Sequence, residues 1–337
     1  MQKNFRCVSI QLGIGGYKPF PAEFTDNKKY GDCKGLSFYT YSILKLLGIK
    51  SYVALVNAEF NNEPVDPAFP CNQFNHVILC IPQPKDTIWL ECTSKTNDFG
   101  ILGAFTENRN ALLITDDGGI LVATPKSTSS ENKSDVITKV VLKDDGSGTT
   151  STLLRSTGDF KEIMNSIIDE KKDDQKESIV FYMGFKQPDE FIITKEDEPG
   201  SITAIDLAIE KIPEFIAGNK MFLSPRIYKI WTTKLPKSVN RKQDYYFQCP
   251  FEKTDTAVYI LPAGYKQNAF PQAKEIKCDF GSYSTKYWYD TERNAIFSIA
   301  SFVLIQNKIP AGKYASVKKF FDEILLDDTQ KIVIKKD

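Results

Sequence analysis

The sequence is poor in histidine and carries no excess of charge: it contains one histidine, His76, and 43 basic residues balance 43 acidic residues in a chain of 337. Because a chain without a net positive field does not attract polyanions, neither nucleic acid nor an anionic membrane surface is an expected partner. No apolar run approaches the length of about 18 residues that a membrane-spanning helix needs. The opening residues, "MQKNFRCVSI", also lack the basic start, apolar middle and small-residue cleavage site of a signal peptide.

Cysteine patterns that bind metals are absent as well. The seven cysteines form no C-x-x-C pair and no zinc-like cluster, so a thiolate metal site is not expected, and the sequence predicts no cofactor. Their number is odd, which leaves at least one thiol without a partner inside the chain. Five of the seven lie in the first 92 residues, so that region is where a reactive thiol is to be sought.

The size of the chain favours two domains, because 42% hydrophobic content over 337 residues is more than one compact core usually organises. The stretch "PKSTSSENKSD" at 125–135 is polar, rich in serine and free of apolar periodicity, which is typical of a linker. We therefore expect a first domain over residues 1–125 and a second region over residues 126–337. A further division of that region near residue 235 stays open.

The hydrophobic patterns predict an α+β fold. Apolar residues recur at three- and four-residue steps from Leu36 to Leu47, which indicates a buried helix that ends at Gly48. Strands are then expected at "SYVALVNA", "FNHVILCI" and "TIWLECTS", followed by a hairpin within "NALLITDDGGILVATP". In the second region, a charged helix from about Phe160 to Met183 precedes many short strands with the spacing of a β-sandwich.

Cys33 stands at the start of the expected buried helix, within "GDCKG" at 31–35. The first turn of a helix presents unpaired N–H groups and the positive end of the helix dipole, and both favour a thiolate over a thiol. Asp32 is suited to cap this helix, and burial of the helix makes a rigid platform for the sulfur. Cys33 is therefore the candidate nucleophile, although Cys33 taken alone is equally consistent with an inert structural cysteine.

His76 lies on an expected strand, where a lone histidine is more often a packed side chain than a catalytic one. The loop to the next strand is centred between Gln83 and Pro84, and an antiparallel pair about that centre places Glu91 directly opposite His76. Their Cβ atoms would then lie about 4.5 to 5.5 Å apart. A carboxylate bonded to one imidazole nitrogen fixes the tautomer and leaves the other nitrogen free to take a proton from a nucleophile such as Cys33.

Other residues have weaker claims on the site. Trp89 would share the sheet face of the carboxylate and wall the site, although a core aromatic is the simpler role. An oxyanion needs two donors, for which the backbone N–H of Cys33 and the side chain of Gln11 are the candidates. Cys80 and Cys92 are expected in the core. The stretch "GIGG" lacks the lysine and the Ser/Thr of a phosphate loop, which favours a flexible cover for a cleft over nucleotide binding.

Three blocks, "GDCKG", "FNHVIL" and "IWLECTS", together resemble the signature blocks of the transglutaminase-like superfamily. The resemblance implies a papain-like core in which Cys33 is the nucleophile, His76 the base and Glu91 the carboxylate that orients the base. The upstream "FRCVSIQLGIGGYKPFPAEF" resembles, more narrowly, bacterial members whose core lies between an N-terminal domain of unknown function and a C-terminal β-rich domain. The resemblance is strong over the first 125 residues and holds only in outline beyond them.

The sequence departs from the family pattern at three positions. Glu91 stands where the family usually carries aspartate, Gly35 replaces a common acidic residue and Cys92 a common proline, yet no triad member is missing. The N-terminal domain of the bacterial relatives is not present, so we expect the sequence to be a segment of a longer protein. Because those relatives are commonly exported, the resemblance implies a periplasmic or cell-envelope location.

These features predict an acyl-transfer enzyme in which Cys33 attacks an amide or peptide carbonyl. Hydrolysis is favoured over transfer to a second amine, because the sequence shows no carboxylates spaced for the calcium that regulates animal transglutaminases. The expected substrates are peptides, proteins or cell-envelope amides. The alternative, from another class, is a non-catalytic binding or assembly module that retains the fold and grips a partner through its β-rich region.

Overall fold

The computed structural model describes residues 4–10, 12–59, 65–69, 71–181, 183–196, 202–238 and 241–337. They form two compact units, Met1–Ser127 with Tyr246–Gln248 and Thr128–Tyr245 with Cys249–Asp337. Both units combine helices with β-sheet, so the expected α+β class is confirmed. Within the described residues, no helix is both long enough and apolar enough to cross a bilayer.

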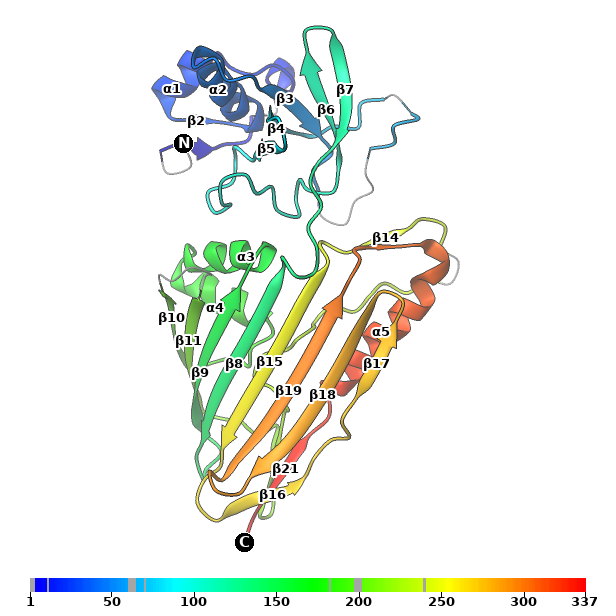
Figure 1. Ribbon diagram of the computed structural model, residues 1–337. Helices are drawn as coiled ribbons and strands as arrows, with labels where there is room; N and C mark the ends of the chain where they lie inside the picture. Colours follow the sequence, from blue (N-terminus) through cyan, green and yellow to red (C-terminus); the bar gives the residue numbers. More distant parts are fainter. Residues whose placement is uncertain are drawn as a thin grey trace. The chain divides into compact units, whose positions relative to one another are not determined.

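The first unit is built on an antiparallel sheet of five strands in the order β5-β4-β3-β6-β7. Figure 1 shows α1 and α2 together beside this sheet, and the hairpin of β6 and β7 extends past the other three strands. The elements are β1 (Arg6–Cys7), the 3₁₀ turn η1 (Gly13–Gly16), α1 (Ala22–Lys28), β2 (Tyr30–Gly31), α2 (Cys33–Leu46), β3 (Tyr52–Val56), β4 (His76–Pro82), β5 (Thr87–Leu90), β6 (Asn110–Thr115) and β7 (Gly118–Ala123).

Strand β4 has a buried core on each of its faces, because successive side chains of a strand point to opposite sides. Leu79 packs with Leu36 of α2, so one face is covered by the helix. Ile78 and Cys80 lie on the other face, where they pack with Trp89 of β5. This burial on both sides explains why β4 reads as the continuous apolar run "HVILCIP".

The second unit contains an eight-stranded sheet in the order β10-β11-β9-β8-β15-β19-β18-β17. Strands from both sides of residue 235 belong to it, because β8 pairs in parallel with β15. Its strands are β8 (Lys133–Leu142), β9 (Gly148–Ser156), β10 (Glu190–Glu196), β11 (Ile202–Ile209), β15 (Phe251–Ile260), β17 (Glu275–Cys278), β18 (Gly281–Asp290) and β19 (Ala295–Leu304). A four-stranded sheet has the order β12-β13-β21-β16, from β12 (Phe215–Ala217), β13 (Lys220–Leu223), β16 (Tyr265–Ala269) and β21 (Ile332–Lys336).

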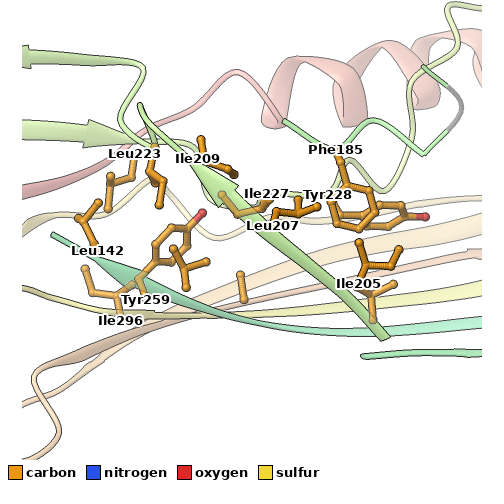
Figure 2. Packing of buried hydrophobic residues seen from close by; sticks show 14 of the residues in the cluster. Leu142, Phe185, Ile205, Leu207, Ile209, Leu223, Ile227, Tyr228, Tyr259 and Ile296 are labelled. Carbon is orange, nitrogen blue, oxygen red and sulfur yellow. The ribbon is translucent and has the colours of Figure 1, made fainter. Parts of the chain in front are cut away.

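The two sheets share one hydrophobic core, which gives the second unit its sandwich-like part. Leu223 of the small sheet belongs to the same buried cluster as Tyr259 and Ile296 of the large one (Figure 2). Helices complete the cover: Met164 and Ile179 join this cluster from α3 and α4, while aromatic rings of α5 contact the large sheet further along. The remaining elements are α3 (Asp159–Ile168), α4 (Lys172–Phe181), β14 (Tyr245–Tyr246), β20 (Lys308–Ile309), η2 (Ala311–Lys313) and α5 (Tyr314–Asp327).

The charged segment from Phe160 to Met183 forms two helices, so the prediction of one continuous helix is wrong. The chain leaves the first helix after Ile168 and starts the second at Lys172. Side chains stabilise the break, because Gln175 Nε2 donates to the backbone oxygen of Ile168 at 3.0 Å. Apolar side chains from both helices belong to the core, Met164 and Ile167 from the first and Ile179 from the second.

Gly281 of β18 allows a close strand contact that a larger residue would disturb. A Cβ atom there would lie 2.2 Å from the backbone oxygen of Val303, so we expect Gly281→Ala to lower the free energy of unfolding by about 1 to 3 kcal/mol. Gly312→Ala is the matched control, because a Cβ at Gly312 meets no atom within 4 Å. Thermal and urea unfolding measure both variants, and equal stability of the two would contradict the prediction.

Candidate active site

Cys33 is the first residue of α2, and its neighbours fix the start of the helix. Asp32 is the N-cap: its Oδ1 accepts the backbone N–H of Gly35 at 2.9 Å, and its other carboxylate oxygen pairs with Lys34 Nζ. Only 9% of Cys33 is exposed. The sequence "GDCKG" therefore starts the helix as expected, and it holds a nearly buried cysteine in the first turn, where backbone N–H groups have no acceptor within the helix.

A buried hydroxyl ties this helix to the strand that carries the imidazole. Ser37, one turn after Cys33, is fully buried and donates to the backbone oxygen of Val77 at 3.1 Å. Val77 follows His76 directly in β4. Because the bond joins the first turns of α2 to the first residues of β4, it limits how far the sulfur and the imidazole can move apart.

His76 and Glu91 form a hydrogen-bonded pair. His76 Nε2 lies 2.9 Å from Oε2 and 3.1 Å from Oε1 of Glu91, and the two side chains are only 10% and 4% exposed. Thr93 holds the same carboxylate, because its backbone N–H and its hydroxyl donate to Oε1 at 3.0 and 2.6 Å. The Cys33 thiol is also within hydrogen-bonding reach of the imidazole. Because Nε2 is bonded to Glu91, Nδ1 is the ring nitrogen left to exchange a proton with Cys33.

The strand register differs from the expected one, so the prediction that His76 directly opposes Glu91 is wrong. Pro82 pairs with Thr87 and Leu79 with Leu90, which shifts the pairing by two residues. The reason is the turn, in which Gln83 donates to the oxygen of Asp86 at 2.8 Å and Pro84 takes the second position that proline favours. A shift of two keeps every side chain on its face, so the carboxylate still reaches the imidazole from just beyond the end of β5.

The charges of the pair support each other. Burial alone lowers the pKa of His76, but the hydrogen bonds with Cys33 and Glu91 and their negative charges outweigh burial and raise the pKa of His76 to about 9. Burial also disfavours the Glu91 carboxylate, yet the bonds from His76 and Thr93 lower the pKa of Glu91 below its ordinary value. The arrangement thus holds an imidazolium beside a carboxylate at neutral pH, with the sulfur of Cys33 within hydrogen-bonding reach of the ring.

Two positioning residues were not predicted from the sequence. Phe105 lies against the His76 ring, with the ring centroids 5.4 Å apart and the planes at 70°. Asn75 locks the start of β4, because its side chain exchanges bonds of 2.7 and 2.8 Å with the backbone of Ala58. Asn75 could have been found from the sequence, because it directly precedes the single histidine. Phe105 could not, because it lies in a loop without a local sequence pattern.

The structure also shows where the residues with weaker claims on the site lie. Trp89 is 4% exposed and packs in the core with Ile78 and Cys80, on the sheet face that also carries His76. Cys92 is buried on the opposite face. Gln11 lies outside the described residues. Across the part of the chain that the structure describes, no three His, Cys, Asp or Glu residues are grouped to hold a metal ion.

Comparisons with known proteins bear on both units. Residues 219–334 match the family described as "Domain of Unknown Function with solved-structure structure (DUF3858)". The fold is similar to the crystal structure of a protein from Parabacteroides distasonis ATCC 8503 described as a "putative protease", with a TM-score of 0.53 and 14% identity over 99% of this chain. The chain spans 49% of that protein's length. At this identity the likeness concerns the fold alone. No curated protein matches the sequence.

The raised pKa of His76 predicts a pH-dependent contribution to stability. A group whose pKa rises from 6.5 to about 9 on folding stabilises the protein fully below pH 6.5, and this stabilisation is lost as the pH rises through about 9. The measurement is the free energy of unfolding of the wild type minus that of His76→Gln, followed from pH 6 to about 10. We expect this difference to be largest at low pH and to shrink as the pH rises.

The difference between the two proteins isolates His76 from other groups. Burial lowers the pKa of Lys253 to about 8 and raises that of Asp255 to about 7, but both residues belong to the second unit and titrate alike in the two proteins. Glu91→Gln serves as a second variant, because loss of the carboxylate should move the change to lower pH. A difference that stays constant with pH would contradict the assignment.

Proposed function

We propose that this protein is a cysteine-dependent hydrolase of peptide or amide bonds from the transglutaminase-like superfamily. Cys33 is the nucleophile, His76 the acid and base, and Glu91 the residue that orients the imidazole. The observation that carries the proposal is the imidazole of the single histidine, bonded at Nε2 by Glu91 and within hydrogen-bonding reach of Cys33. The fold is also similar to that of a protein described as a "putative protease", which is compatible with this reaction class but is an argument by analogy of fold alone.

The geometry suits acyl transfer through a thioester. The sulfur of Cys33 attacks the carbonyl carbon, and the backbone N–H of Cys33 in the first helical turn stabilises the negative oxygen that forms. His76 then gives its proton from Nδ1 to the leaving amine, so the C–N bond breaks and a thioester remains. Neutral His76 next takes a proton from water, which attacks the thioester and releases the acid. Glu91 keeps the ring in place through both steps.

The proposed substrates are peptides, proteins or amides of the cell envelope, and water is the proposed acceptor. An envelope location follows from the same superfamily resemblance. A primary amine offered in place of water distinguishes hydrolysis from transfer, because a transferase would give a new amide in proportion to the amine concentration. The non-catalytic alternative differs in another way: such a module would bind peptide equally well with and without the Cys33 sulfur and would release no acid.

Peptide hydrolysis tests the proposal directly. On a library of envelope-derived peptides followed by mass spectrometry, we expect Cys33→Ala to reduce the rate at least about a thousandfold and Glu91→Gln about a hundredfold or more. Because the leaving amine needs the protonated imidazole, kcat/KM should fall as the pH rises through about 9. Cys278→Ser, in β17 of the second unit, is the matched control and should keep full activity. Equal rates for Cys33→Ala and wild type would refute the proposal.

Alkylation by iodoacetamide tests the cysteine without any knowledge of substrate. The alkylation rate is followed from about pH 6 to 9, because a free thiol loses reactivity about tenfold per pH unit below about 8.5. The exposed Cys71 is the reference cysteine measured in the same sample. If the proposal holds, Cys33 reacts faster than Cys71 at the low end of this range, and His76→Ala removes this advantage. Peptide mapping reports each cysteine separately. If Cys33 followed the profile of Cys71 in the wild type, the activated nucleophile would be ruled out.

Thr93 offers a graded test of how the carboxylate is held. Thr93→Val removes the 2.6 Å hydroxyl bond to Glu91 but leaves the backbone bond. We expect kcat to fall about tenfold with KM unchanged, because a bond to a charged group contributes about 1.5 to 3 kcal/mol and part of it is retained. Thr93→Ser restores the hydroxyl and should restore kcat. A change in KM alone would point to substrate contact instead of positioning.

A further inference from the structure

A second cysteine, Cys7, lies beside the proposed nucleophile. Strand β1 pairs in parallel with β2, and the register places Cys7 opposite Gly31. The pairing is held by bonds of 3.0 Å from the N–H of Arg6 to the oxygen of Lys29 and from Val8 to Gly31. Because Gly31 stands two residues before Cys33, the short strand β1 runs along the segment that leads into α2.

The register turns Cys7 and Cys33 toward the same side. Paired residues of neighbouring strands project to one face, and so do residues i and i+2 of an extended segment. Asp32 between them is extended, with φ −82° and ψ −173°, so Gly31 and Cys33 share a side with Cys7. Gly31 has no side chain, and the start of α2 lies on that side: a Cβ at Gly31 would be 3.3 Å from the backbone nitrogen of Leu36.

The charges around Cys7 agree with this placement. Partial burial of its sulfur, followed by the negative charges of Cys33, Glu91 and Asp32, raises the pKa of Cys7, while Lys95 acts in the opposite direction. Cys7 thus interacts with groups from α2 and from the segment after β5, which together build the site. At neutral pH it is a protonated thiol beside the nucleophile.

We propose that Cys7 is a resolving cysteine that forms a reversible disulfide with Cys33 under peroxide and so protects the nucleophile while switching it off. The Cys33 thiolate attacks one oxygen of hydrogen peroxide, the O–O bond breaks, hydroxide leaves, and the sulfur is oxidised by two electrons to a sulfenic acid. The sulfur of Cys7 then attacks that of Cys33, the S–O bond breaks, and hydroxide leaves as water with the Cys7 proton. A dithiol reductant returns both thiols.

The strand that carries Cys7 can make the necessary adjustment. A disulfide needs Cα atoms about 4.4 to 6.8 Å apart. Strand β1 has two residues, both exposed, and pairs with β2 alone among its described neighbours in the sheet. Cys80 and Cys92 are poor competitors, because both are buried in the cores on the two faces of β4, whereas Cys7 is exposed.

The test treats the full chain with one to ten equivalents of hydrogen peroxide, blocks free thiols with iodoacetamide and maps the peptides by mass spectrometry. We expect a linked peptide that contains Cys7 and Cys33, together with recovery of Cys33 alkylation after dithiothreitol. In Cys7→Ser, Cys33 should pass to sulfinic and sulfonic acids that dithiothreitol does not reverse. Cys71→Ser removes another exposed cysteine and should leave the linked peptide unchanged.

The outcomes separate this inference from the proposed function, on whose nucleophile it rests. If Cys7 and Cys33 form the disulfide but the protein hydrolyses no peptide, the result supports this inference and contradicts the proposed hydrolase. If the protein hydrolyses peptides but forms no such disulfide, the result supports the hydrolase and contradicts this inference. Equal irreversible oxidation of Cys33 in wild type and Cys7→Ser, or a link from Cys33 to Cys71, overturns the inference. Cys7→Ala is a second variant for the same comparison of Cys33 oxidation with the wild type. Thermal melting shows which of the two Cys7 variants is folded, and the comparison uses that variant.

Discussion

The buried pairing of the His76 imidazole with the Glu91 carboxylate is the interaction on which the candidate site depends. The side chains of His76 and Glu91 are only 10% and 4% exposed. Side chains buried to this extent carry charge only where hydrogen bonds within the protein replace those that water would make. Thr93 gives the carboxylate two donors, and the imidazole gives it a third. The same bonds orient the ring. The orientation of the imidazole and the charge of the Glu91 carboxylate therefore depend on each other, because a rotated imidazole would leave the buried carboxylate without one of its hydrogen-bond donors.

One loop supplies much of this constraint. It begins at Glu91, which bonds the imidazole, and it contains Phe105, whose ring lies against the same imidazole. Between them Asn97 Nδ2 donates to the backbone oxygen of Leu102 at 2.9 Å, so the loop is closed by its own side chains. The sheet and α2 place one half of the site, and this loop places the other.

The sequence predicted the start of α2 and the shared sheet face of His76 and Glu91, but not the exact pairing of their strands. The helix start at Cys33 followed from "GDCKG" because capping and dipole effects are local. The shared face of His76 and Glu91 survived a register error of two, because faces repeat every second residue. The register itself depends on where Pro84 sits in its turn, which strand patterns do not encode. Phe105 was missed since its contact with His76 is made only in the folded chain.

The family match at 219–334 does not coincide with a structural unit, and the reason lies in the large sheet. Strand β15 lies inside the matched segment but pairs on one side with β8, which precedes it. Cutting the chain at the start of the match would expose the edge of β15 along nine paired positions, from Glu252 to Ile260.

Inside the matched segment, Arg226 pairs with Asp328 although 102 residues separate them. The Tyr283 hydroxyl joins this group by donating to Asp327 at 2.8 Å. This buried pairing joins the two ends of the segment. Removal of either charge would leave the other buried without its counter-ion, which is strongly destabilising. The matched segment thus contains a buried polar cluster that joins its two ends, whereas the large sheet also needs β8 from outside the segment. The stable unit to produce therefore begins before β8, not at the start of the match.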